Sequence, residues 1–243
     1  MRRPHWMLAG CATLLVFGIA LGDARSDPSL GKARPAAGAE AQEAEAIIQK
    51  ARQVSAAAQT MEAEVALNRL DSSTMEYKVQ MMKPGFAHYR LREQNGVAWQ
   101  VISDGKSVYV VDESNKEYRK LPYATTGREM LVPSASEVCG PLHAFFAPEQ
   151  IGALGTPRSA GTKQVNGQTY QTVEFSTNNE QFRWTYYFGA SGLLEGIEFI
   201  RIRDGRTETQ SMWLKNVKVD VAMKREQFAF TPPADFKEMA EAN

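Results

Sequence analysis

The fold of this 243-residue chain is decided by residues 75–111, which read MEYKVQMMKPGFAHYRLREQNGVAWQVISDGKSVYVV. Apolar and polar side chains alternate in this stretch, most clearly from Met75 to Met81. A period of two is typical of β-strands that bury one face. Asn95-Gly96 and Asp104-Gly105 interrupt the alternation, and both dipeptides favour tight hairpin turns. The stretch therefore predicts a meander of antiparallel strands.

The same alternation marks strands further along the chain. Beyond the meander, which ends with Glu117–Leu121, the predicted strands occupy Tyr170–Ser176, Phe182–Phe188, Leu193–Arg203 and Thr207–Val221. Dipeptides such as Asn166-Gly167 supply the turns between them. Because no Gly-rich linker separates the two groups of strands, we expect one continuous sheet of about 10–11 strands.

A helix precedes the strands, between Ala39 and Gln59. Its apolar residues recur three or four positions apart, which places them in one stripe on a helix. They are Ala44, Ile47, Ile48, Ala51, Val54 and Ala58. Glutamates gather near the start of the segment, where the helix dipole favours negative charge.

These elements predict a mainly β fold with some α structure, namely a single antiparallel open β-barrel, or half-barrel, with an N-terminal helix and a helical lid insert. A sheet of this size must curl to bury its apolar face. One helix cannot cover it flat, so we expect the helix to lie in or across the mouth of the half-barrel. The expected divisions are a signal peptide (1–22), a disordered tether (23–38), the barrel domain (39–236) and a C-terminal tail (237–243).

Large apolar side chains occupy the inward positions of the predicted strands. Concave and mostly apolar walls are what sites for apolar ligands need, so we predict that these residues line such a site. The alternative is that they fill a solid core. The predicted ligand-binding residues are Tyr77, Met81, Tyr89, Trp99, Val101, Phe175, Phe182, Trp184, Tyr186 and Phe188.

Residues 123–151 break the strand pattern with several prolines and glycines. A segment of about 30 residues without strands is long for a plain loop. Leu142, Phe145 and Phe146 form a short, helix-like apolar piece within it. We expect these three residues to belong to a lid over the ligand, or to a structural plug on the open sheet.

The N-terminus has the pattern of a cleaved secretory signal peptide. Arg2-Arg3 precedes an apolar run from Ala12 to Leu21, and small residues at Ala20 and Gly22 suit cleavage near Gly22. Leu8-Ala9-Gly10-Cys11 resembles a lipidation site, but the apolar run follows Cys11 instead of ending at it. We therefore expect an exported, periplasmic protein, with a lipid anchor at Cys11 as the alternative.

Composition and motifs argue against several classes of function. Cleavage removes two arginines and no acid, so 28 basic and 28 acidic residues become 26 and 28, a net charge of −2. Such a chain has no general attraction to nucleic acid. No zinc-ligand spacing, nucleophile elbow or phosphate loop is present, so we expect no enzyme, metal or cofactor. Cys139 and His143 lie four positions apart, but Gly140-Pro141 between them argues against a continuous helix that would pair them.

Three short motifs resemble the outer-membrane lipoprotein-sorting (LolA/LolB-like) superfamily. They are the hairpin from Ser103 to Tyr118, the Met82-Lys83-Pro84-Gly85-Phe86 turn with the strand after it, and the ending Phe228-Ala229-Phe230-Thr231-Pro232-Pro233-Ala234. The resemblance covers about residues 40–236 and implies an open β-barrel with helical lid elements and a cavity for acyl chains. The chain departs from the dedicated carriers of the family at their lid-locking arginine on an early strand, for which Arg69 and Arg90 are candidates that the sequence does not separate. The chain looks like a divergent member.

The sequence thus predicts a periplasmic, non-enzymatic carrier or binding protein that holds lipid or lipoprotein acyl chains, or another apolar ligand, in a half-barrel. Its partners would be that ligand, with an inner-membrane donor and an outer-membrane acceptor. The alternative is a periplasmic protein-interaction or sensor module with a packed, ligand-free barrel.

Overall fold

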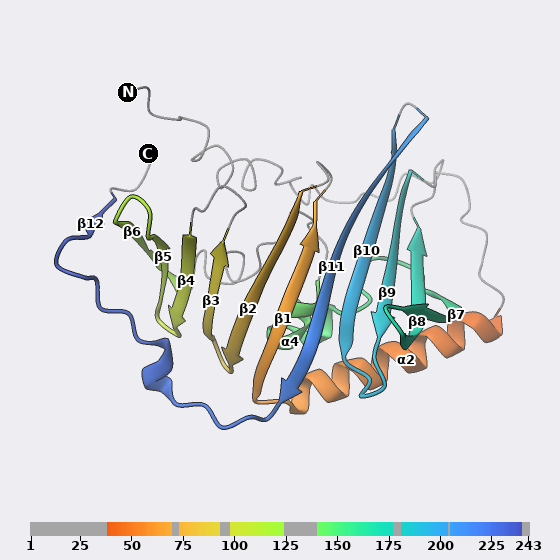
Figure 1. Cartoon of the computed structure of the whole chain (residues 1–243). Coiled ribbons are helices and arrows are strands. Elements are labelled where there is room, and N and C mark those ends of the chain that lie inside the picture. The colour runs from red at the N-terminus through yellow and green to blue at the C-terminus, as the bar shows by residue number, and fades with distance from the viewer. Residues whose placement is uncertain are drawn as a thin grey trace, which may run out of the picture. The chain divides into compact units, whose positions relative to one another are not determined.

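The computed structural model describes residues 38–69, 73–92, 98–123, 140–176, 181–203 and 205–239, all within the compact unit Pro35–Asn243. The predicted signal peptide, Cys11, nearly all of the tether, the Asn95-Gly96 turn, Cys139 and most of the 123–151 insert lie outside these residues. The described part is one 12-stranded sheet with a long helix and a few short ones (Figure 1).

The sheet has the order β12-β6-β5-β4-β3-β2-β1-β11-β10-β9-β8-β7. Its neighbours are antiparallel except for β12, which is parallel to β6. The expected open half-barrel is confirmed, because β12 and β7 form separate edges. The strands are β1 (Thr60–Asn68), β2 (Thr74–Met82), β3 (Phe86–Arg92), β4 (Ala98–Asp104), β5 (Ser107–Asp112), β6 (Glu117–Pro122), β7 (Arg158–Val165), β8 (Gln168–Ser176), β9 (Phe182–Phe188), β10 (Leu194–Arg203), β11 (Arg206–Val219) and β12 (Lys237–Glu238).

Within the described residues, the turns at Asp104-Gly105 and Asn166-Gly167 form where the dipeptides predict them. At the β4–β5 hairpin the Asp104 carboxylate accepts hydrogen bonds from the backbone N–H groups of Lys106 and Ser107, at 2.8 and 2.7 Å. At the β7–β8 hairpin Asn166 and Gly167 have φ angles of 51° and 80°. Both angles lie in the left-handed region that Asn and Gly tolerate best.

Helix α2 (Gly38–Ala57) confirms the predicted N-terminal helix. Figure 1 shows it running beneath the sheet, from β7 to the start of β1. Its buried residues, Ala44, Ile47, Ile48, Ala51 and Ser55, belong to the predicted stripe except for the last. At its end Lys83, from the β2–β3 turn, donates hydrogen bonds to the carbonyls of Ser55 and Ala56. A cation at the C-terminus satisfies carbonyls that the helix leaves free.

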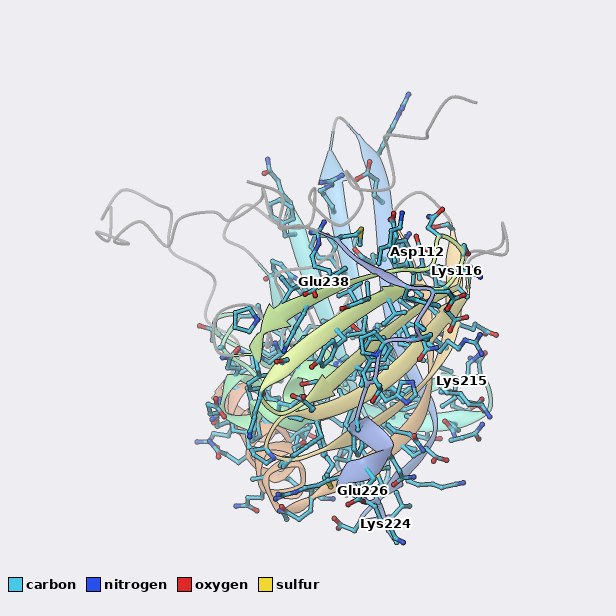
Figure 2. All side chains as sticks on the ribbon, turned by 90° about the vertical axis from the view of Figure 1, so that its left-hand side faces the viewer. Asp112, Lys116, Lys215, Lys224, Glu226 and Glu238 are labelled. Carbon is cyan, nitrogen blue, oxygen red and sulfur yellow. The ribbon has the colours of Figure 1, made fainter. Side chains whose placement is uncertain are left out.

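The C-terminal segment crosses the outer side of the sheet. The 3-10 helix η3 (Arg225–Phe228) packs on β3 and β4, where the rings of Phe228 and Phe86 lie 5.8 Å apart. Phe230 contacts Tyr109 and Tyr118, and β12 then pairs with β6. Figure 2 shows this path from Lys224 and Glu226 to Glu238. The aromatic ending thus covers outward side chains and shields an edge strand, which would otherwise present free backbone groups.

Candidate functional site

The inner face of the sheet is the one that packs against α4 (Pro141–Phe146), and all ten predicted ligand-binding residues lie on it. The strand register aligns Tyr77 with Leu91 and Trp99 across β2, β3 and β4. On the other half it aligns Phe175, Trp184 and Phe199 across β8, β9 and β10. Alternation on each strand then places the remaining predicted residues on the same face.

Most of these side chains are part of one buried core. Tyr77, Met81, Tyr89, Val101, Phe175, Tyr186 and Phe188 are all buried in it. Trp99 and Trp184 are partly buried against the same core, together with Phe146. The structure therefore brings the predicted residues together, with most of them already packed against protein.

Three aromatic side chains remain partly exposed on β9 and β10, and we call them the aromatic wall: Phe182, Trp184 and Phe199. Their ring centroids lie 5.4 to 6.1 Å apart, with the Phe182 and Phe199 rings stacked at 12°. Above them Arg201 of β10 forms an ion pair with Glu208 of β11 at 2.5 Å. The aromatic wall is therefore apolar and has a charged border. Such a surface suits a ligand in which an apolar group adjoins a polar one.

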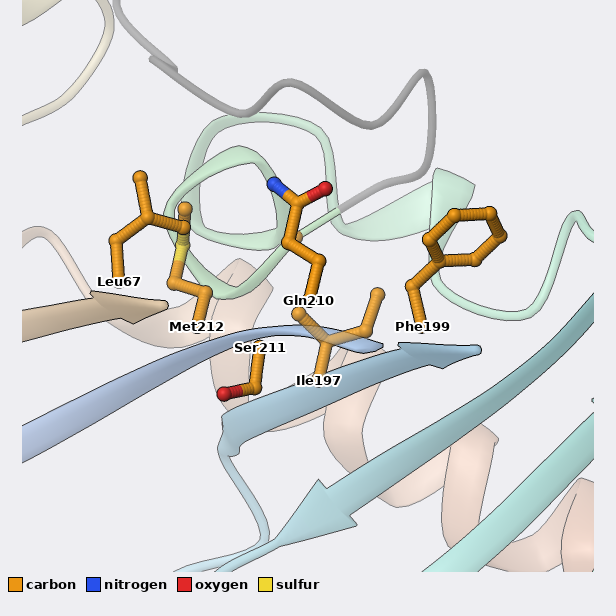
Figure 3. Close-up of a pocket in the computed structure, with 7 residues that line it drawn as sticks. Leu67, Ile197, Phe199, Gln210, Ser211 and Met212 are labelled. Carbon is orange, nitrogen blue, oxygen red and sulfur yellow. The ribbon is translucent and has the colours of Figure 1, made fainter. Parts of the chain in front are cut away.

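A small pocket opens beside the aromatic wall (Figure 3). Its cavity volume of about 10 Å³ is room for roughly one water molecule. Figure 3 shows Leu67, Gln210, Phe199 and Met212 directed toward α4, whereas Ser211 points the other way. The lining residues are Leu67, Gly140, Ile197, Phe199, Gln210, Ser211 and Met212. Gln210 brings a buried amide, with 5% of the residue exposed, into this apolar surface.

Tyr77 and Trp184 carry two of the buried polar atoms of the inner face that have no hydrogen-bond partner. In the part of the chain that the structure describes, neither the Tyr77 hydroxyl nor the Trp184 Nε1–H has a hydrogen-bond partner. Burial raises the pKa of Tyr77 far above its ordinary value, although the charge of Arg69 acts against this rise. The phenol is thus neutral and able to donate, and buried donors without acceptors are rare in folded proteins.

The two arginines considered for a lid-locking role differ in their surroundings. Arg69 lies close enough to Tyr77 to affect its pKa. Arg90 is exposed and forms an ion pair with Glu113, a residue that also bonds Gln100. Arg69 is therefore the one whose charge acts on the inner face.

The insert contributes the expected short helix. Leu142 and Phe145 of α4 are buried in the core, and the ring of Phe145 lies 4.8 Å from Lys83 Nζ. Phe146 is partly buried and contacts Phe145, with centroids 5.1 Å apart. The helix starts at Pro141 after an extended Gly140, so it does not reach back to residue 139. The 3-10 helix η2 (Pro148–Gln150) then leads to Ile151, which is also buried.

Several residues of this site were not predicted from the sequence. Phe199 and Ile197 lie in a predicted strand, and their alternation with Glu198 could have identified them. Gln210 sits within Thr207–Ser211, a polar run that looks exposed, but in the folded sheet it is buried beside Phe199, its partner on β10. Among the described residues, no group of three or more His, Cys, Asp and Glu side chains could hold a metal ion. The same residues contain no helix long and apolar enough to cross a membrane.

Solved structures resemble the chain in fold. An uncharacterized conserved protein from Thermus thermophilus is 11% identical with a TM-score of 0.50, covering 82% of this chain and 100% of its own. LprF from Mycobacterium bovis is 12% identical with a TM-score of 0.45, covering 80% and 98%. A LolA superfamily protein from Nitrosomonas europaea is 10% identical with a TM-score of 0.37, covering 77% and 97%. The likeness to the Thermus thermophilus protein is one of fold.

Sequence comparisons give the family. No curated protein matches the chain. A family model described as "Predicted periplasmic protein (DUF2092)" matches residues 39–240, which include every described strand and nearly all of α2. The chain therefore belongs to the DUF2092 family of predicted periplasmic proteins.

Proposed function

We propose that the protein is a periplasmic, non-enzymatic carrier or binding protein that holds acyl chains of a lipid or lipoprotein, or another apolar ligand, against the inner face. The observation that carries this proposal is the aromatic wall. Phe182, Trp184 and Phe199 form a continuous, partly exposed apolar surface on the inner face of an unclosed sheet. Apolar surface of this kind is normally buried unless it receives a ligand or partner.

The predicted ligand-binding residues would then have two roles. The aromatic wall, with Trp99 across the sheet, would contact the ligand directly because these rings are partly exposed. The fully buried Met81, Tyr186 and Phe188 would form the base of the site and fix its shape.

The insert would act as the lid. Leu142 and Phe145 anchor α4 in the core, whereas Phe146 lies at the surface of the cluster. Gly140, at the start of this helix, lines the pocket beside the wall. Movement of the insert would therefore change the room beside Phe199 and Met212. A signal peptide cleaved near Gly22 would leave a diffusing carrier between an inner-membrane donor and an outer-membrane acceptor.

Solvent extraction of the exported protein followed by mass spectrometry tests the proposal. Protein purified from the periplasm without detergent is expected to carry lipid or another apolar compound in stoichiometric amount. The Trp184→Ala variant is expected to carry less, and Trp213→Ala, a change of similar size on the outer face, is expected to carry as much as the original. A folded protein that releases no apolar compound would contradict the proposal.

The packing of the core supports a second candidate, a protein-interaction or sensor module with a ligand-free barrel. Met81, Tyr186 and Leu142 have no exposed surface, and the pocket holds roughly one water molecule. In this case the aromatic wall or the insert would bind a protein. Crosslinking in intact cells followed by purification distinguishes the candidates, because a stoichiometric protein partner without lipid favours the second.

A further inference from the structure

Arginines border the aromatic wall on the inner face of the sheet. Arg201 of β10 pairs with Phe182 of the wall on one side and with Glu208 of β11 on the other. Arg206 lies two positions before Glu208 on β11, so alternation places it on the same face. Figure 1 shows the β10–β11 hairpin extending beyond the neighbouring strands at this end of the sheet. Charged residues therefore follow the wall directly along β10 and β11.

Arg69 approaches the wall from the other side of β11. It directly follows Asn68, which pairs with Ser211, so continuing the register brings it level with Gln210. Gln210 in turn pairs with Phe199 of the wall. Adjacent strands lie about 4.8 Å apart, so the Cα atoms of Arg69 and Phe199 are roughly 10 Å apart along this row. Arg69 thus borders the same apolar surface from the β1 side.

These arginines carry more charge than their described neighbours neutralise. We call Arg69, Arg201 and Arg206 the arginine border, and Glu208, the ion-pair partner of Arg201, is the acid beside them. None of the ion pairs among the described residues includes Arg69 or Arg206. The described side chains at this border are three arginines and one glutamate, which gives a net charge of +2. On the outer face, by contrast, lysines such as Lys215 pair with glutamates.

This arrangement suits an anionic headgroup. A guanidinium presents its N–H donors in a planar fork that matches the oxygens of a carboxylate or a phosphate. The arginine border is at least partly exposed, so an anion can reach it without entering the small pocket. The alkyl chain of the same ligand would lie on the wall next to it. A ligand with a neutral headgroup would not gain this attraction.

We infer that the arginine border binds the anionic headgroup of an amphiphilic ligand, a carboxylate or a phosphate, while the alkyl chain lies on the aromatic wall. The inference rests on the proposed function, because it assigns a headgroup to the ligand proposed above. Arg69 and Arg206 supply the charge that no described acid compensates. Glu208 lowers the affinity, because it occupies the Arg201 guanidinium and repels the anion.

Displacement of N-phenyl-1-naphthylamine from the delipidated protein tests this inference, with dodecanoate, dodecyl phosphate and methyl dodecanoate as competitors. Arg69→Gln is expected to weaken at least one of the two anionic competitors by about three- to tenfold, as loss of a partly exposed charged contact does. Binding of the neutral ester and of the dye is expected to stay the same. The anion that is weakened more identifies the preferred headgroup, a carboxylate or a phosphate.

Two further variants separate this role from a general effect of charge or of folding. Arg183→Gln removes the same charge from β9, but Arg183 pairs with Ile200 on the outer face, so all competitors are expected to bind as before. Glu208→Gln removes the acid of the border. It is expected to strengthen the same anionic competitor by about threefold or more, a gain that a damaged fold cannot produce.

The inference and the proposed function fail in different ways. If Arg69→Gln weakens the ester as much as the anions, or weakens no competitor, the inference is wrong although an apolar ligand is bound. An equal effect of Arg183→Gln, or no gain from Glu208→Gln, also contradicts the inference. If neither the dye nor any competitor binds, the proposed function itself fails.

Discussion

Arg52 of α2 donates two hydrogen bonds to the carbonyl oxygen of Ile151, from Nε at 3.0 Å and from Nη2 at 2.7 Å. This contact joins residues 99 positions apart and fastens the end of the insert to the N-terminal helix. Ile151 is itself fully buried, so the carbonyl is held where the insert returns to the sheet. The position of α4 therefore depends on α2 as well as on the sheet.

Replacement of Arg52 by methionine is expected to lower the free energy of unfolding by about 1.5–3 kcal/mol, the usual range for hydrogen bonds made by a charged group. Urea denaturation measures this difference. Lys78→Met is the control, because Lys78 forms only an exposed ion pair with Glu64 at 3.8 Å. It is expected to change stability by less than about 0.5 kcal/mol, and an equal loss in both variants would contradict the role of Arg52.

Phe228 is expected to be the main attachment of the C-terminal segment to the outer face. Its side chain is fully buried against Phe86, so Phe228→Ala is expected to cost about 3–5 kcal/mol. Phe230→Ala, two residues on, removes a partly exposed ring and is expected to cost clearly less. Thermal unfolding of the two variants checks this order. A segment that only rests on the sheet would give two small and similar losses.

Gly196 leaves room for the ring of Trp213, its partner on β11. A Cβ atom at this position would come within 2.5 Å of the ring, so Gly196→Ala is expected to destabilise the protein by about 1–3 kcal/mol. In the Trp213→Leu background the side chain is smaller, so Gly196→Ala is expected to cost much less stability there. A double-mutant cycle measures this difference. Gly38→Ala has open space and is expected to have little effect. Equal costs of Gly196→Ala with and without Trp213 would show that the ring is not the obstacle.

Glu195 is expected to make stability depend on pH. Burial raises the pKa of its carboxyl above the ordinary value, with the Ser191 hydroxyl opposing this shift. At pH values between the ordinary pKa and the raised one, the folded protein keeps the proton while the unfolded chain releases it. The contribution of Glu195 to stability therefore falls as the pH rises through this range. Glu195→Gln is expected to be more stable than the original at pH 7, with the difference vanishing near pH 4. An unchanged difference between pH 4 and pH 7 would contradict this account, and exposed Glu76→Gln is the control.

Local alternation predicts the hairpin strands well. Met75–Met81 becomes β2, and Phe182–Phe188 becomes β9 with the same bounds. β1 (Thr60–Asn68) is different, because its sequence TMEAEVALN is rich in alanine and glutamate and also suits a helix. Its pairing with β11, more than 140 residues away, holds it in the sheet. Long-range pairing of this kind leaves no mark in the local sequence, which explains why β1 and the two-residue β12 were not predicted.

The candidate site, like the sheet, could be predicted from the sequence only in part. Large inward side chains such as Trp184 and Tyr77 follow from alternation, but their degree of burial does not. Exposure of the wall at Phe182 and burial at Tyr186 depend on where α2 and α4 lie along the strands. The isolation of the Tyr77 hydroxyl is likewise a property of the packed structure.

Equilibrium titration of the delipidated protein with N-phenyl-1-naphthylamine tests the central claim most directly. The account predicts saturable binding at about one dye per protein, weakened at least about tenfold by Trp184→Ala and unchanged by Trp213→Ala on the outer face. A folded protein that shows no saturable fluorescence increase, or equal loss of binding in both tryptophan variants, would contradict the claim that the inner face binds an apolar ligand.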